Sequence, residues 1–300
     1  MRSTAPGSRR SGAATLVLVA MTACWGSTFF LIHGLVTRVP AADFLAVRFS
    51  IASVVMLLAA PRAIARLSPA VRRHAVVLGC LYGVAQIGQT VGLEHTTASV
   101  AGFITGLYVV LTPLFAAAIL RTPTSALTWI AVGLATVGLG VLSLNGLSIG
   151  AGEGLTLLAA MLYALHIVGL GAWSSPTDAL GMSLVQCLVI TAIALVAAAP
   201  GGITLPQRPG DWAVVLYTAV FASAVALLGQ TWAQAHLPAT RSAIIMSMEP
   251  VFAAGFAVGL GGESLSARMV LGGVLVLCAM LLAELVPRRR IEGEVPHIAV

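Results

Sequence analysis

The side chains that could do chemistry in this chain are a few polar groups within long apolar stretches. Glu249 stands midway along one such stretch, immediately before Pro250, and Arg48 lies several residues inside another. A carboxyl could carry a proton or bind a cationic group, and a guanidinium could bind a carboxylate through its fork of donors. A charge at the centre of a membrane helix costs about 2.5–3.5 kcal/mol, so we expect such groups to face protein or water.

Each of these two residues also has a structural interpretation. Glu249 could be a protonated carboxyl that bonds a neighbouring helix and holds a kink. Arg48 is shallow enough to snorkel toward the outer surface and could bond backbone carbonyls at a helix end.

Four amides occur in two pairs. Gln86 and Gln89 are three residues apart, and Gln230 and Gln234 are four apart, so each pair shares one face of a helix. Amides can bond a substrate, but they also tie helices together, at about 0.6 kcal/mol per contact.

Aromatic residues and one histidine complete the candidates. Trp25, Tyr108 and Tyr163 could stack on a substrate or simply pack, and His166 could carry a proton or form a neutral hydrogen bond. Ser27 lies close to Trp25. The predicted substrate pathway comprises Trp25, Ser27, Arg48, Gln86, Gln89, Tyr108, Tyr163, His166, Gln230, Gln234 and Glu249.

Pro113 and Pro250 lie inside apolar stretches, where each removes a backbone hydrogen bond and kinks its helix. Their similar places in the two halves of the chain favour hinges that shape a cavity over passive bends.

The elements that carry these residues are predicted to be membrane helices. The chain is 59% hydrophobic and 9% charged, with mean hydropathy +1.00. These values leave too little charge to cover a water-facing surface. Ten apolar stretches of about 20 residues have the length of membrane spans. They are 13–35, 41–60, 75–93, 98–120, 124–146, 150–172, 180–199, 212–235, 239–260 and 266–286.

All sixteen basic residues are arginines, and their distribution predicts the orientation. With a cytoplasmic amino terminus, twelve fall on the inner side and three (Arg38, Arg208 and Arg268) on the outer side, as the positive-inside rule requires.

No charge occurs between Arg10 and Arg38, which favours a retained first helix over a cleaved signal peptide.

An internal repeat organises the chain. Gly88-Gln89-Thr90 with His95 recurs 141 residues later as Gly229-Gln230-Thr231 with His236. Five spans per half is an odd number, so the halves must lie inverted in the membrane, as in many transporters. The predicted domains are a cytoplasmic tail (1–12), two five-span repeats (13–146 and 150–286) and a second cytoplasmic tail (287–300).

The order of several short motifs resembles the EamA-type members of the drug/metabolite transporter superfamily. They are Trp25-Gly26-Ser27-Thr28-Phe29, Arg48, Thr97-Ala98, Phe103-Ile104-Thr105-Gly106-Leu107-Tyr108, Pro113, Glu249-Pro250-Val251-Phe252 and Gly262-Glu263. The resemblance implies an all-α, ten-helix carrier in the cell's inner membrane, with a cavity between the halves and the fifth and tenth spans at the periphery. Leu120-Arg121 replaces the Gly-Glu that the family often has, so an acidic role there is not carried over.

We therefore expect a secondary transporter or facilitator for a small, amino-acid-like metabolite, acting by alternating access as an exporter. A cationic drug or amine efflux carrier is the alternative, and a membrane enzyme or a non-transport scaffold is a further one. The chain shows no Walker loop, GxSxG or HExxH motif, no metal or cofactor spacing and no nucleic-acid-binding module. The expected partners are the substrate and the lipid bilayer, around a monomer or homodimer.

Overall fold

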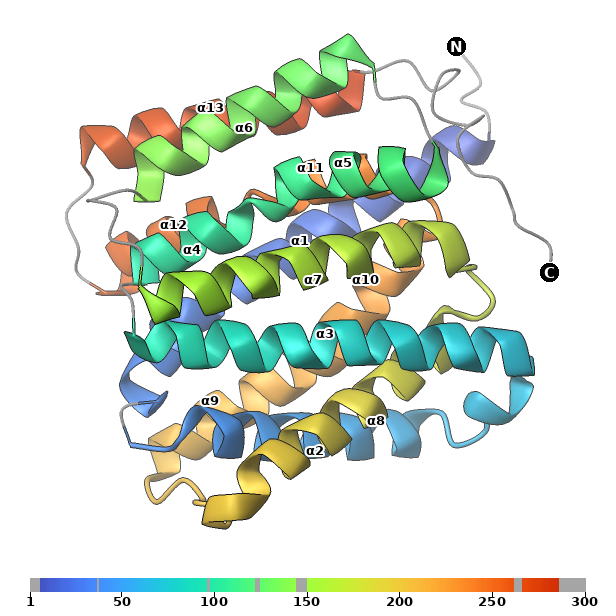
Figure 1. Ribbon diagram of the computed structural model, residues 1–300, viewed down its shortest axis with the longest axis vertical. Helices are drawn as coiled ribbons and strands as arrows, with labels where there is room; N and C mark the ends of the chain where they lie inside the picture. Colours follow the sequence, from blue (N-terminus) through green and yellow to red (C-terminus); the bar gives the residue numbers. More distant parts are fainter. Residues whose placement is uncertain are drawn as a thin grey trace.

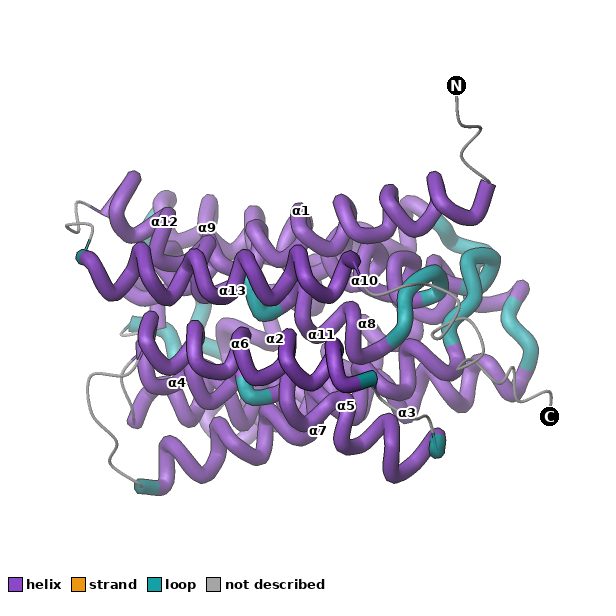
Figure 2. Tube along the Cα trace, turned by 90° about the horizontal axis from the view of Figure 1, so that it is seen from above, coloured by secondary structure: helices purple, strands orange, loops and turns teal. Residues whose placement is uncertain are grey.

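The computed structural model describes residues 6–36, 38–95, 98–121, 125–143, 150–261 and 266–285. Every regular element in these ranges is a helix, and Figure 2 shows the helices packed side by side. The α-helices are α1 (Pro6–Val36), α2 (Ala41–Ala59), α3 (Pro69–His95), α4 (Ala98–Gly106), α5 (Tyr108–Leu120), α6 (Ala126–Ser143), α7 (Ala151–Trp173), α8 (Ala179–Ala198), α9 (Pro209–Ala219), α10 (Ala226–Gln234), α11 (Ala239–Met246), α12 (Glu249–Gly261) and α13 (Ala267–Leu285). Short 3₁₀ turns (Ile64–Arg66 and Ala199–Gly201) and a π-helix (Val220–Val225) complete them.

Within the described residues, seven helical segments are long and apolar enough to cross a membrane. Three shorter apolar segments, Ile104–Leu120, Ala126–Val141 and Ala267–Leu282, lie within the fourth, fifth and tenth predicted stretches. Large apolar side chains such as Leu16, Leu58 and Val196 are more than 70% exposed on the outside of the bundle. Such a surface suits contact with lipid better than contact with water.

Two of the predicted stretches are interrupted rather than continuous. Leu107 separates α4 from α5, and Ser247 and Met248 separate α11 from α12. Leu107 and Met248 are 141 residues apart, the same offset as the repeated Gly-Gln-Thr motif. The two breaks therefore occur at corresponding places in the two halves.

The prolines lie close to these breaks but not at them. Pro113 lies inside α5, six residues after Leu107, and Pro250 is the second residue of α12. A proline in the first turn of a helix removes no intrahelical bond. The structure thus places the interruption of the backbone before each proline, and the hinge role of Pro113 and Pro250 stays a prediction.

Helices from the first half of the chain pack mainly on helices from the second. α3 packs on α7 and α8, α2 on α8, and α1 on α12 and α10. Figure 1 shows α6 and α13 side by side along one edge of the molecule, as the family resemblance implied for the fifth and tenth spans.

Glycines allow α3 to approach two partners closely. A Cβ at Gly79 would lie 2.8 Å from the Val189 Cβ on α8, and one at Gly92 would lie 2.5 Å from the Thr156 Oγ1 on α7. Small residues let membrane helices pack backbone to backbone. Gly255 and Gly259 on α12 differ, because a Cβ at either position would meet no described atom within 4 Å.

Candidate functional site

A cavity of about 90 Å³ lies among α1, α2, α3, α4, α5, α7, α10, α11 and α12. Nine of the eleven predicted pathway residues line it, although they come from distant parts of the chain. They are Trp25, Arg48, Gln86, Gln89, Tyr108, Tyr163, His166, Gln230 and Glu249.

Ser27 and Gln234 are not in this lining. The Ser27 hydroxyl donates to the Cys24 carbonyl (2.7 Å) and bonds the Tyr217 hydroxyl on α9 (2.8 Å). The Gln234 Nε2 donates to the Ile167 carbonyl on α7 (2.9 Å). Both side chains fasten helices together in this conformation, so a direct contact with substrate stays a prediction for them.

Arg48 is held from one side by the π-helix. Its Nε donates to Ser223 Oγ (2.7 Å), and its Nη2 donates to the Ala222 carbonyl (3.0 Å), which also accepts the Trp25 Nε1 hydrogen (3.0 Å). A π-turn shifts backbone carbonyls out of the regular i to i+4 ladder, and such turns are frequent at functional sites. The Ala222 carbonyl of the π-helix therefore positions two cavity side chains, those of Arg48 and Trp25.

The guanidinium of Arg48 does not snorkel to the surface, which corrects that interpretation of the sequence. Arg48 is only 5% exposed, and its guanidinium carbon lies 5.1 Å from the Phe49 ring centroid and 5.9 Å from that of Phe44. No described residue forms an ion pair with Arg48 or accepts a hydrogen bond from its Nη1. A buried cation without a carboxylate partner can bind an anionic group that enters the cavity.

Glu249 begins α12, directly after the break at Ser247 and Met248. Its carboxylate has no hydrogen bond or ion pair with any described residue, so the structure gives no support to a carboxyl bonded to a neighbouring helix. A carboxylate at a helix N-terminus is favoured by the helix dipole. Glu249 therefore presents an unpartnered carboxyl group to a ligand in the cavity.

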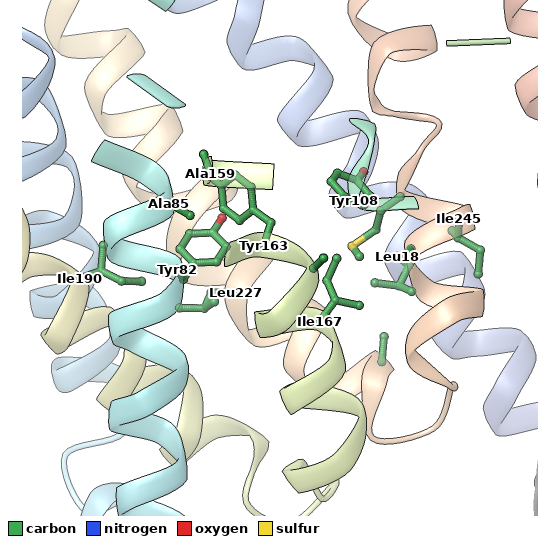
Figure 3. Packing of buried hydrophobic residues seen from close by; sticks show 14 of the residues in the cluster. Leu18, Tyr82, Ala85, Tyr108, Ala159, Tyr163, Ile167, Ile190, Leu227 and Ile245 are labelled. Carbon is green, nitrogen blue, oxygen red and sulfur yellow. The ribbon is translucent and has the colours of Figure 1, made fainter. Parts of the chain in front are cut away.

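An aromatic and amide cluster forms one wall of the cavity. The rings of Tyr82 and Tyr163 meet edge to face at 5.4 Å, and the Tyr82 and His166 rings meet at 5.0 Å. The Tyr163 hydroxyl donates to Gln89 Oε1 (2.9 Å), and Gln89 Nε2 donates to Thr105 Oγ1 (3.1 Å). Figure 3 shows Tyr82 beside Tyr163, with Tyr108 farther across the site.

Sequence reasoning missed the less polar part of the lining. Tyr82 could have been found, because it lies one turn before Gln86 on the same face of α3. The missed residues are Thr28, Ile32, Phe44, Tyr82, Thr90, Leu93, Ala101, Thr105, Ile167 and Met246. Most are apolar or weakly polar and carry no signal that separates a cavity wall from ordinary helix packing.

Two regions of the chain, residues 12–144 and 150–285, match the family model of the EamA-like transporter family. The chain belongs to the EamA-like transporter family. This result confirms the resemblance seen in the motifs, and it makes the protein a multi-pass membrane transporter rather than a soluble protein. The family points to transport and not to catalysis.

Individual relatives agree with the EamA-like assignment. A protein of Archaeoglobus fulgidus named an uncharacterized transporter is 31% identical over 279 residues, which cover 90% of this chain and 84% of the relative. One solved crystal structure superposes with a TM-score of 0.79 at 18% identity and covers 93% of this chain and 98% of that one. At that identity the superposition shows a shared fold alone.

Proposed function

We propose that this EamA-like transporter exports small amino-acid-like zwitterions by alternating access through the cavity between its halves. The observation that carries the proposal is the presence of Arg48 and Glu249 in one cavity without an ion pair between them. A zwitterion can bring its carboxylate to Arg48 and its ammonium to Glu249, and it thereby neutralises both charges at once. A charge-assisted hydrogen bond contributes about 1.5–3 kcal/mol, so two such contacts are enough to select the ligand.

The helix breaks support alternating access. The breaks at Leu107 and at Ser247 and Met248 occur at corresponding places, and each adjoins a helix that contributes to the cavity. In inverted-repeat carriers, interrupted helices near the midplane line the binding site, and one half rocks against the other. We propose ten spans in two inverted repeats, with residues 13–146 and 150–286 as the repeats.

A cationic drug or amine is the alternative substrate. The carboxylate of Glu249 and the rings of Tyr82, Tyr108 and Tyr163 could bind it through charge and cation–π contacts. Such a ligand leaves the buried charge of Arg48 unneutralised, which favours the zwitterion.

Export takes place across the inner membrane with both termini in the cytoplasm. Ten helices can enclose the pathway in a monomer or in each subunit of a homodimer.

Reconstitution tests the proposal. Purified protein in liposomes is expected to show saturable uptake and counterflow of a labelled neutral amino acid, with and without an imposed pH gradient. Counterflow requires a carrier that exposes its site to both sides. Uptake of labelled cationic amines but not of any zwitterion would favour the alternative, and the absence of all counterflow by folded protein would refute a carrier.

A further inference from the structure

The orientation of one buried amide leaves a hydrogen-bond acceptor without a partner in the cavity wall. Gln234 Nε2 donates to the Ile167 carbonyl (2.9 Å), so Gln234 Oε1 faces Gln230 and accepts from its Nε2 (3.1 Å). A backbone carbonyl can only accept, and this fact fixes both amide orientations. Gln230 Oε1 is consequently an acceptor, and no described residue donates to it, although Gln230 is only 3% exposed.

The same argument applies to His166. Gln186 Nε2 donates to the Met182 carbonyl (3.2 Å), so Gln186 Oε1 accepts from His166 Nε2 at 2.8 Å. No described carboxylate pairs with this fully buried ring, which favours its neutral form. With the hydrogen on Nε2, the Nδ1 atom keeps its lone pair and has no described partner.

The two residues that carry these acceptors, His166 and Gln230, both line the cavity, and a hydrogen bond from Gln234 links their helices. Ile167, which receives the bond from Gln234, directly follows His166 on α7. Gln230 lies one turn before Gln234 on α10, and both Gln230 and His166 line the cavity. A buried polar atom without a partner is unfavourable, so a ligand that donates a hydrogen bond here gains over one that cannot.

We propose that His166 Nδ1 and Gln230 Oε1 form a subsite for a hydrogen-bond donor in the side chain of the substrate. This inference rests on the proposed function, in which Arg48 and Glu249 take the carboxylate and the ammonium. The side chain is then left to meet His166 and Gln230. The substrates that fit are amino acids with a hydroxyl or a primary amide, rather than purely aliphatic ones.

Pairs of amino acids with matched shape test the subsite. Threonine and valine differ by a hydroxyl in place of a methyl group, and asparagine and leucine differ by an amide in place of two methyl groups. We expect threonine and asparagine to bind the purified protein in detergent about tenfold more tightly than valine and leucine. Titration calorimetry measures each affinity. Equal affinities within both pairs, or no binding by any of the four, would overturn the subsite.

Two variants localise the discrimination. Gln230→Met and His166→Phe each keep the volume but remove an acceptor, and each is expected to lower the threonine-to-valine affinity ratio toward one. The matched control is Gln89→Met, because both polar ends of that amide already have partners in Thr105 and Tyr163. It should change both affinities by a similar factor. If both variants fold and the threonine-to-valine affinity ratio is undiminished in both, the assignment of the subsite to His166 and Gln230 is refuted. If neither variant folds, the affinities of the matched amino-acid pairs for the wild-type protein decide whether the subsite exists.

Counterflow in liposomes with the same four amino acids separates this inference from the proposed function. Discrimination in detergent without counterflow would leave the subsite standing and refute transport of these amino acids. Counterflow with equal affinities for each pair would leave transport standing and refute the subsite.

Discussion

Arg48 carries a buried positive charge, and its described hydrogen-bond and ring contacts are all with neutral groups. Ser223, the Ala222 carbonyl and two phenylalanine rings surround it, and within the described residues no carboxylate comes within ion-pair distance. Burial of a charge is unfavourable unless the charge is paired. Binding of an anionic group of a ligand would therefore stabilise the buried charge of Arg48. An arginine that already pairs with a carboxylate would gain much less.

Arg48→Met should remove carboxylate binding and keep the packing against Phe44 and Phe49. We expect the affinity for zwitterions to fall about tenfold to hundredfold, in line with one charge-assisted hydrogen-bond group. Competition by amino-acid methyl esters, which lack the carboxylate, should fall much less. Arg208→Met changes an exposed arginine in the same way and serves as the control. Equal losses for acids and esters would contradict a carboxylate contact.

Glu249→Gln should weaken binding of the substrate ammonium and remove any coupling to protons at this position. We expect a loss of affinity of about tenfold or more, and no stimulation of transport by an imposed pH gradient. Glu94→Gln is the control, because Glu94 is exposed at the end of α3. Wild-type rates with unchanged pH dependence in Glu249→Gln would rule out the proton-linked role.

At the scale of elements, the irregular parts of the helices build the site. The π-helix Val220–Val225 positions Arg48 and Trp25, and the break before α12 places Glu249 at a helix N-terminus. A regular helix satisfies its own carbonyls and amides along its length, so it has few backbone groups to offer. Irregular backbone at membrane depth is tolerated where protein covers it or where it lines a cavity.

The crossing of α1 and α12 depends on Gly26. A Cβ there would lie 2.7 Å from the Phe252 Cβ and 2.9 Å from both the Ala253 nitrogen and the Glu249 carbonyl oxygen. Gly26→Ala should therefore push α12 away from α1 and lower the free energy of unfolding by about 1–3 kcal/mol. The melting temperature and the transport rate should both fall. Thermal unfolding in detergent and initial uptake rates measure both effects.

Gly255→Ala provides the matched control on α12. Gly255 is exposed, and a Cβ there would meet no described atom within 4 Å. Alanine should raise the stability slightly, by up to about 1 kcal/mol, because it has the better helix propensity. A variant at Gly26 as stable and active as that at Gly255 would contradict the close approach.

At the scale of the whole molecule, the two halves of the chain hold each other in place. α3 lies between α7 and α8, and α1 lies against α10 and α12. Arg38, in the connection after α1, pairs with Asp211 at the start of α9. Since the first-half helices pack on second-half helices and the cavity lies between them, relative movement of the halves necessarily changes the cavity.

The proposed orientation predicts which loops face each side of the membrane. In a cysteine-free background, a cysteine at the exposed Gln207 should react with an impermeant maleimide in intact cells. A cysteine at the exposed Ser68, in the arginine-rich connection before α3, should react only after lysis. Labelling of both residues from the outside, or the reverse pattern, would contradict the orientation with cytoplasmic termini.

The sequence by itself determined the membrane character, the helical stretches and the family. These features are local: span length, hydropathy and short motifs can be read residue by residue. It also identified nine residues of the cavity. Polar groups inside a span are costly in contact with lipid, so they are expected to face protein or a cavity. The two helix breaks share the 141-residue offset of the repeated Gly-Gln-Thr motif, but the sequence analysis did not predict them and expected kinks at Pro113 and Pro250 instead.

Only the tertiary structure decided which of these groups share one cavity and which fasten helices. In a span, both the lipid-facing and the protein-facing sides are apolar, so periodicity does not show which face is inside. For this reason Ser27 and Gln234 were placed with the lining although they bond other helices. The π-helix that holds Arg48, and the unpartnered acceptors on His166 and Gln230, arise from contacts between distant segments. Such contacts exist only after the helices have packed.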